Sequence, residues 1–187
     1  MVKKKTCIFI SGQGSNLKNI IYHTRDKNFP INVSLVICNN RNAQGITYAK
    51  LYNIPLLVIN TKNRIYENKI LAALKKHKIN FICLAGYMKI LSKKIISNFK
   101  NKIINIHPSL LPKFKGLNTF KRILNNNEIK TGCTVHYVNK KLDDGKIVIK
   151  KFFYLSSNDT ESSIKKKTQI LEYKAYPEAI VKIFRDC

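Results

Sequence analysis

Short apolar segments alternate with longer amphipathic stretches through the first half of the chain. The apolar segments predict strands at residues 6–10, 33–37, 55–58, 81–84 and 103–106. These segments are apolar throughout rather than alternating, which is typical of strands buried on both faces of a parallel sheet. Between two of them, Tyr66, Ile70, Leu71 and Leu74 recur at helical spacing, which predicts a helix packed on that sheet. The pattern indicates a doubly wound α/β arrangement.

The pattern changes after residue 106. A proline-rich turn and a short helix near 119–124 lead to two further strands, 131–138 and 147–153, which form an antiparallel pair joined by residues 139–146. Asp159 or Thr160 caps a final helix that runs towards Phe184, and Pro177 predicts a kink or break in it. The expected fold class is α/β, with an open twisted sheet, a Rossmann-like parallel N-terminal half and antiparallel strands added in the C-terminal half.

The length of 187 residues suits one compact domain, and neither a repeat nor a linker interrupts it. We therefore expect a single domain over 1–187, with a phosphate-binding half of about 1–100 and a second half of about 101–187. Since no apolar run approaches the ~20 residues of a membrane span, and the first apolar run is too short for a signal peptide, we expect a cytoplasmic protein without a membrane partner.

The charge is strongly positive, with 35 Lys and Arg against 10 Asp and Glu, a formal net charge of +25. Such a balance raises the possibility of a polyanionic partner. However, the lysines are spread over every segment and accompany heavy use of Ile and Asn, which a bias in genome composition also produces. A nucleic-acid-binding module would instead gather lysines and exposed aromatic residues on one face. We expect no nucleic-acid partner.

The five cysteines are scattered along the chain and show no Cys-x-x-Cys spacing; they are Cys7, Cys38, Cys83, Cys133 and Cys187. This spacing argues against a disulfide framework and against a zinc site. We expect most of them to be small core residues, and we expect no metal.

The first predicted strand ends in a glycine-containing turn, Ser11-Gly12-Gln13-Gly14-Ser15-Asn16, directly before a helical pattern. Glycines there allow backbone amides to approach a ligand, and a helix N-terminus favours an anion. The third glycine of the dinucleotide fingerprint is absent, and no acidic residue closes the second strand. The turn therefore indicates one phosphate rather than a dinucleotide, with an ordinary tight turn as the alternative.

A second motif, Asn105-Ile106-His107-Pro108-Ser109-Leu110-Leu111-Pro112, lies at the C-terminal end of a predicted strand, where open α/β sheets bind ligands. An Asn and a His two residues apart can face the same side. An amide donor and a titratable imidazole suit a carbonyl oxygen that becomes negatively charged. The other three histidines, His23, His77 and His136, are interpreted as structural.

Carboxylates are scarce, and the adjacent pair Asp143 and Asp144 lies in the loop between the two late strands. An aspartate buried near His107 would favour the imidazolium and raise the pKa of that histidine. The alternative is a plain turn, since Asp-Gly is a common turn signal.

At these residues the chain resembles the phosphoribosylglycinamide formyltransferase family over essentially all 187 positions. The motifs that carry the resemblance are the glycine turn, residues 84–91, 105–112 and 132–136, and Leu142-Asp143. The resemblance implies transfer of the formyl group of 10-formyltetrahydrofolate to the amino group of glycinamide ribonucleotide in purine biosynthesis. It implies an enzyme with small-molecule substrates. It also implies that the enzyme is a monomer or a homodimer and needs no metal.

The resemblance also implies roles for individual residues. Direct attack by the amine would produce a tetrahedral intermediate stabilised by the catalytic residues Asn105, His107 (protonated) and Asp143. The ribonucleotide would be bound by Gly14, Ser15, Asn16 and Glu172. The folate would be bound by Arg64, Met88, Lys89, Ile90, Leu91, Asn105, Val138 and Asp143. The chain departs from the family pattern at Lys89, where an Arg is usual, and at Asp144-Gly145-Lys146, where Gly-Gly-Pro is common.

Two related families are the nearest alternatives. Methionyl-tRNA formyltransferase shares the Asn-x-His-Pro-Ser-Leu-Leu-Pro turn, and its tRNA partner would explain the charge. We expect it less, because it has a second, tRNA-binding domain after this length and a different first loop. Formyltetrahydrofolate deformylase carries an additional N-terminal domain.

Overall fold

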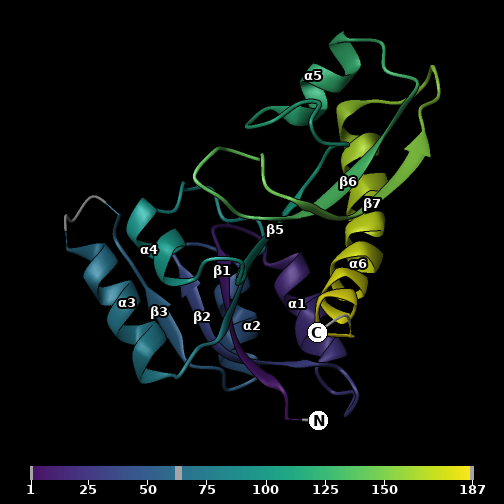
Figure 1. Cartoon of the computed structure of the whole chain (residues 1–187). Coiled ribbons are helices and arrows are strands. Elements are labelled where there is room, and N and C mark those ends of the chain that lie inside the picture. Colours follow the sequence, from purple (N-terminus) through teal and green to yellow (C-terminus); the bar gives the residue numbers. More distant parts are fainter. Residues whose placement is uncertain (1, 62–64, 186–187) are drawn as a thin grey trace. The chain divides into compact units, whose positions relative to one another are not determined.

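The computed structural model describes residues 2–61 and 65–185, and the chain divides into two compact units, Met1–Ile104 and Asn105–Cys187 (Figure 1). That the whole chain acts as one domain stays a prediction. Arg64, expected to bind folate, lies outside the described residues.

The first unit is built on a parallel sheet. Its strands are β1 (Lys4–Ile10), β2 (Ile31–Cys38), β3 (Leu56–Val58) and β4 (Phe81–Leu84), in the order β3-β2-β1-β4. Each neighbouring pair runs parallel. Every residue of β4 and the last five residues of β1 are buried, as expected of strands covered on both faces.

The described part of the first unit contains the helices α1 (Ser15–His23), α2 (Gly45–Leu51), α3 (Tyr66–Lys76) and α4 (Lys93–Asn98). Helix α3 buries Ile70 and Leu74, two of the four positions that its periodicity predicts, and the other two, Tyr66 and Leu71, are half-buried. Ser92 caps α4, since its hydroxyl accepts a hydrogen bond from the Ile95 N–H over 3.3 Å. Strand β5 (Ile103–His107) begins in this unit and ends in the second.

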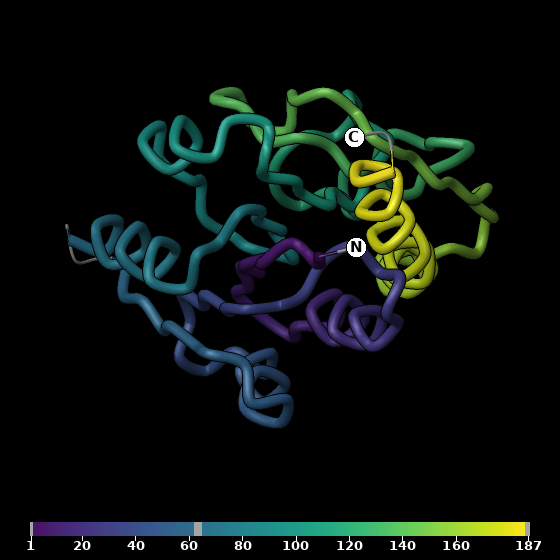
Figure 2. The backbone as a smooth tube through the Cα atoms, turned by 60° about the horizontal axis from the view of Figure 1, so that its bottom comes forward, coloured from purple at the N-terminus to yellow at the C-terminus, as the bar shows by residue number. Residues whose placement is uncertain are grey.

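The second unit contains α5 (Thr119–Asn125), β6 (Lys130–Tyr137), β7 (Ile147–Tyr154) and α6 (Glu161–Arg185). Strands β6 and β7 pair antiparallel, as expected, and α6 packs against both (Figures 1 and 2). The strand order at this end is β5-β6-β7. Gly132 permits the β6–β7 pairing, because a Cβ atom there would lie 1.9 Å from the Lys151 carbonyl oxygen.

Helix α6 begins as the sequence predicts and runs past Phe184 to Arg185, close to the expected end. The Thr160 hydroxyl accepts a hydrogen bond from the Ser163 N–H, and Lys167 pairs with the Asp159 carboxylate over 2.7 Å. The helix runs through Pro177 without interruption, so the expected break is wrong. Pro177 is buried beside Ala175, Tyr176 and Ala179, and packing of this turn offsets the hydrogen bond that proline cannot donate.

These elements confirm the expected fold class, an α/β protein with a parallel N-terminal half and antiparallel strands towards the C-terminus. Four of the cysteines are free and buried, as expected of core residues: Cys7, Cys38, Cys83 and Cys133. Among the described residues, no helix has the length and apolar character that crossing a bilayer requires.

Candidate functional site

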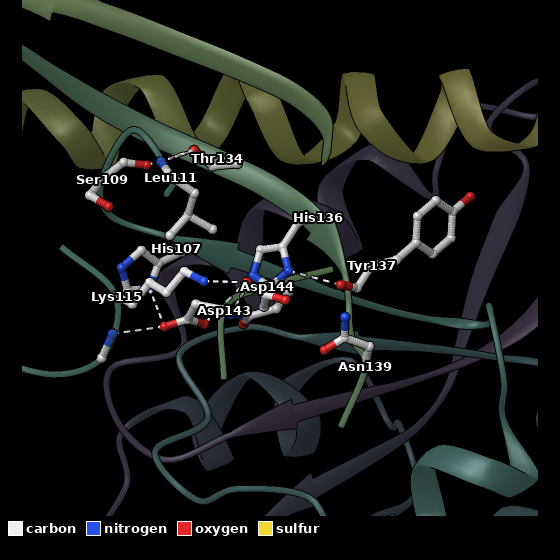
Figure 3. A network of polar contacts seen from close by, with 12 residues as sticks. His107, Ser109, Leu111, Lys115, Thr134, His136, Tyr137, Asn139, Asp143 and Asp144 are labelled. Atoms are coloured by element: carbon white, nitrogen blue, oxygen red, sulfur yellow. Dashed lines mark hydrogen bonds and ion pairs between the residues drawn. The ribbon is translucent and has the colours of Figure 1, made fainter. Parts of the chain in front are cut away.

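His107, the last residue of β5, is held by acceptors on both sides of its ring. Its Nε2 donates to the Phe114 carbonyl oxygen over 2.9 Å, and its Nδ1 lies 3.3 Å from Asp143 Oδ2. The side chain is only 6% exposed. Figure 3 shows the His107 and Asp143 side chains directed towards each other. The expectation that a carboxylate from the late loop reaches this histidine agrees with this geometry.

The pKa of His107 differs from the expected direction. Burial lowers it, and the nearby Asp143 carboxylate and the Phe114 carbonyl raise it only in part. The nearby His136 ring and the Arg122 guanidinium add to the lowering. The expected rise was wrong because removal of the imidazolium from water costs more than one carboxylate contributes.

Asp143 is half-buried, and its backbone adopts a left-handed conformation with φ of 47°. The Gly116 N–H donates to its Oδ2 over 2.9 Å. Burial alone would raise its pKa, but His136, the Gly116 N–H and His107 together lower it to about 2. His136 Nε2 lies 3.7 Å from Oδ1, beyond hydrogen-bond length. Asp143 is therefore an ionised carboxylate at neutral pH.

His136 brings Asn105 to the same cluster. It lies near the end of β6 with 2% of its surface exposed, and its Nδ1 donates to the Tyr137 carbonyl oxygen over 2.9 Å. Its other nitrogen, Nε2, lies 3.3 Å from Asn105 Nδ2. Asn105, His136, Asp143 and His107 thus form one continuous series of polar contacts within the second unit.

Asp144 does not share the environment of Asp143. Its carboxylate pairs with Lys115 Nζ, and the side chains of both residues are about one third exposed (Figure 3). The Lys115 ammonium lowers the pKa of Asp144. The two neighbouring aspartates therefore have different partners, and it is Asp143 that faces the histidine.

The loop after β5 is fixed by buried hydrogen bonds to β6. The Thr134 hydroxyl donates to the Ser109 carbonyl over 2.7 Å and accepts from the Leu111 N–H over 3.1 Å (Figure 3). Phe114 has a positive φ of 56°, a strained conformation for a bulky residue. The strained backbone delivers the Phe114 carbonyl to His107, and Gly116, two residues later, delivers its N–H to Asp143.

The glycine turn of the first unit lies where β1 meets α1. Gly14 precedes α1 with φ of 72°, and neither a side-chain cap nor an acidic residue occupies the first turn of the helix. This end of α1 is suited to an anion. Gly14 also has a packing role, because a Cβ atom there would lie 2.4 Å from the Gly45 Cα.

Residues 88–91 follow β4 in the first unit. Met88 and Ile90 are exposed by 63% and 75%, Lys89 is also exposed, and Leu91 is buried in the core. The Met88 N–H donates to the Ser11 hydroxyl over 2.8 Å, and that hydroxyl donates to Asn39 over 2.6 Å. The ends of β1, β2 and β4 are thereby linked at one edge of the parallel sheet, and the linkage holds the backbone of Met88.

Two expected ligand contacts belong to the second unit. Glu172 lies half-buried on α6, near enough to Cys133 that, after burial, its charge is the next cause raising the pKa of that thiol to about 12. Val138 is half-buried just after β6. No group of three or more His, Cys, Asp or Glu suited to a metal occurs in the described part of the chain.

A family model described as formyl transferase matches residues 4–180. This chain belongs to the formyl transferase family. The match covers both units and includes the glycine turn, β5 and the loop that carries Asp143.

Solved structures and curated proteins resemble this chain over most of its length. A phosphoribosylglycinamide formyltransferase from Anaplasma phagocytophilum is 35% identical with a TM-score of 0.93, covering 99% of this chain and 89% of its own. One from Bacillus halodurans is 32% identical with a TM-score of 0.93, covering 96% and 95%. The human trifunctional purine biosynthetic protein adenosine-3 is 36% identical over 95% of this chain, which spans only 18% of that protein.

Sequence reasoning missed one member of the cluster. His136 was interpreted as a structural strand residue, yet it contacts both Asn105 and Asp143. The sequence carried no signal for this role, because Asn105 lies 31 positions away and the fold alone places the two side chains together. Lys115, the partner of Asp144, had no signal, because an exposed lysine in a lysine-rich loop carries no information about its partner.

Proposed function

We propose that this chain is a phosphoribosylglycinamide formyltransferase, which moves the formyl group of 10-formyltetrahydrofolate to the amino group of glycinamide ribonucleotide. The observation that carries the proposal is the cluster in the second unit. It joins an amide, an imidazole and an ionised carboxylate at Asn105, His107 and Asp143. The names of solved structures 32–35% identical to the chain support the choice of acceptor.

The formyl oxygen gains negative charge when the amine attacks the formyl carbon. Asn105 Nδ2 is a neutral hydrogen-bond donor, which stabilises such an oxygen without transferring a proton to it. His107 supplies a second donor. Both of its ring nitrogens have acceptor partners, so donation to the formyl oxygen requires that either the Phe114 carbonyl or Asp143 is exchanged for that oxygen.

Asp143 orients His107 and stabilises its charged form. Because burial lowers the pKa of His107, the imidazolium depends on the carboxylate 3.3 Å away. The attacking amine must also lose a proton, and Asp143 is the ionised group beside His107 that receives it, through water. The same proton then passes from Asp143, again through water, to the folate nitrogen as the bond between that nitrogen and the formyl carbon breaks.

The family resemblance implies which residues would hold the substrates. Gly14, Ser15 and Asn16 would bind the ribonucleotide phosphate at the start of α1, and Glu172 would contact the same substrate. The folate would contact Met88, Lys89, Ile90 and Leu91 after β4, together with Val138 and Arg64. The exposed apolar side chains of Met88 and Ile90 fit the aromatic ring of a folate, because burial of apolar surface between them is favourable in free energy.

Transfer to methionyl-tRNA is the alternative that the family leaves open. The test is an assay of the purified chain with 10-formyltetrahydrofolate and each acceptor separately, in which product is identified by mass spectrometry. We expect formylglycinamide ribonucleotide, and loss of it in Asn105→Ala and His107→Ala. Formylation of the tRNA but not of the ribonucleotide would overturn the proposal. A cytoplasmic location and a monomeric or homodimeric state stay predictions.

A further inference from the structure

The two ring nitrogens of His136 have different hydrogen-bonding roles. The Tyr137 carbonyl oxygen, 2.9 Å from Nδ1, can only accept a hydrogen bond, so the proton of the ring lies on Nδ1. In the neutral ring, Nε2 then carries a lone pair and accepts. The ring is 2% exposed, so water does not compete for these positions.

Nε2 lies between two candidate partners, and the distances decide which one it serves. Asn105 Nδ2 is 3.3 Å away and Asp143 Oδ1 is 3.7 Å away, beyond hydrogen-bond length. The other oxygen of Asp143, Oδ2, accepts from the Gly116 N–H and pairs with His107, and these contacts hold the carboxylate at this distance from His136. The lone pair on Nε2 therefore accepts from the Asn105 amide.

This contact fixes the direction of the Asn105 side chain. The two ends of a carboxamide have nearly the same shape, but one donates and the other accepts. An acceptor at His136 Nε2 holds the NH₂ end, and it uses only one of the two N–H groups. A proton on Nε2 would have the opposite effect, because it would attract the amide oxygen and turn the NH₂ group away.

We propose that His136 is a positioning residue, which fixes the Asn105 amide so that its second N–H donates to the formyl oxygen. The proposal deepens the proposed function and rests on it. The sequence of contacts runs from the Tyr137 carbonyl through the His136 ring to Asn105. The Tyr137 carbonyl thereby determines the tautomer of His136. The tautomer in turn determines which end of the Asn105 amide is directed towards the formyl oxygen.

Kinetics of matched variants test the positioning role. His136→Leu removes the acceptor and should lower kcat about tenfold to a hundredfold, less than the ~10²–10³-fold typical of losing an oxyanion donor itself. The KM values should change less than about threefold. His136→Gln offers a side-chain oxygen that accepts from Asn105, and it should restore most of the loss. Equal loss of kcat in both variants would overturn the proposal.

A double-variant comparison separates positioning from general disturbance. In an Asn105→Ala background there is no amide to orient, so His136→Leu should lower kcat by less than about twofold. Full additivity of the two losses would contradict the proposal. Thermal unfolding of each variant shows whether the chain remains folded.

The tautomer itself can be measured in the unmodified chain, independently of any substrate. Long-range ¹H–¹⁵N spectra at neutral pH should show His136 protonated at Nδ1 and unprotonated at Nε2. A proton on Nε2 would refute the proposal even if the enzyme transfers formyl groups as proposed. If the expected tautomer is found but glycinamide ribonucleotide is not formylated, the proposed function fails rather than the geometry of His136.

Discussion

Gly145 passes so close to the backbone of Tyr137 that a Cβ atom at position 145 would lie 1.7 Å from the Tyr137 carbonyl oxygen. The same oxygen accepts the hydrogen bond from His136 Nδ1, and the Tyr137 N–H donates to the Lys146 carbonyl over 2.9 Å. The loop that carries Asp143 therefore closes onto β6 at a point where only glycine fits.

Gly145→Ala is expected to destabilise the chain by about 1–3 kcal/mol, because the backbone must move to relieve the contact. Gly12→Ala is the matched control, since a Cβ atom there has no neighbour within 4 Å. Its free energy of unfolding should stay within about 0.5 kcal/mol of the original. Urea denaturation measures both. Equal stability of the two variants would show that the loop relaxes without cost.

Asp143 should contribute to stability above its unfolded pKa of 3.8 and lose that contribution as the pH falls towards its folded pKa of about 2. The full contribution corresponds to about 2 kcal/mol. The stability difference between the original chain and Asp143→Asn should therefore shrink by about 1 kcal/mol between about pH 5 and pH 3. Denaturant titrations at the two pH values measure it, and a difference independent of pH would contradict the assignment.

His107 should titrate below the usual value of 6.5 in the ligand-free chain, because burial disfavours its charged form. In Asp143→Asn the midpoint should fall further, since the carboxylate is the largest effect that raises this pKa. ¹⁵N chemical shifts of the ring, followed against pH, give the midpoint in both proteins. A midpoint above 6.5 in the original chain would mean that the ion pair outweighs burial.

Asp144 and Asp143 form a matched pair of neighbouring carboxylates with different partners. Asp143→Asn removes the charge beside His107 and should lower kcat by ~10²-fold or more. Asp144→Asn breaks an exposed ion pair with Lys115, and kcat should stay within about twofold. Steady-state kinetics with both substrates decide between them. A large loss in Asp144→Asn alone would transfer the carboxylate's role to that residue.

Asn16 should affect the ribonucleotide more than the folate, because it lies in the first turn of α1 beside the glycine turn. Asn16→Ala is expected to raise the Kd of the ribonucleotide about tenfold, the loss of one hydrogen bond to a charged group. Asn28→Ala, at an exposed turn, is the control. Calorimetric titration with each ligand separates the effects, and a change in folate affinity alone would move the phosphate elsewhere.

The sequence by itself determined the elements and their types. Residues 81–84, apolar throughout, became a strand with every residue buried, and the spacing of Ile70 and Leu74 correctly gave the inner face of α3. Both results follow from local periodicity, which is present in the sequence whatever other segments the strand or helix packs against. The one clear error in this group, a break at Pro177, arose because packing around a buried turn outweighed a local preference.

Only the tertiary structure decided which side chains meet and with what charge. His136 and Asn105 are 31 positions apart, and the direction of each ring or amide depends on acceptors that the fold delivers, such as the Tyr137 carbonyl. The pKa of His107 moved opposite to expectation, because the degree of burial cannot be read from neighbours in sequence. Hydrogen bonds and desolvation act over a few ångströms in space, and sequence patterns record only distances along the chain.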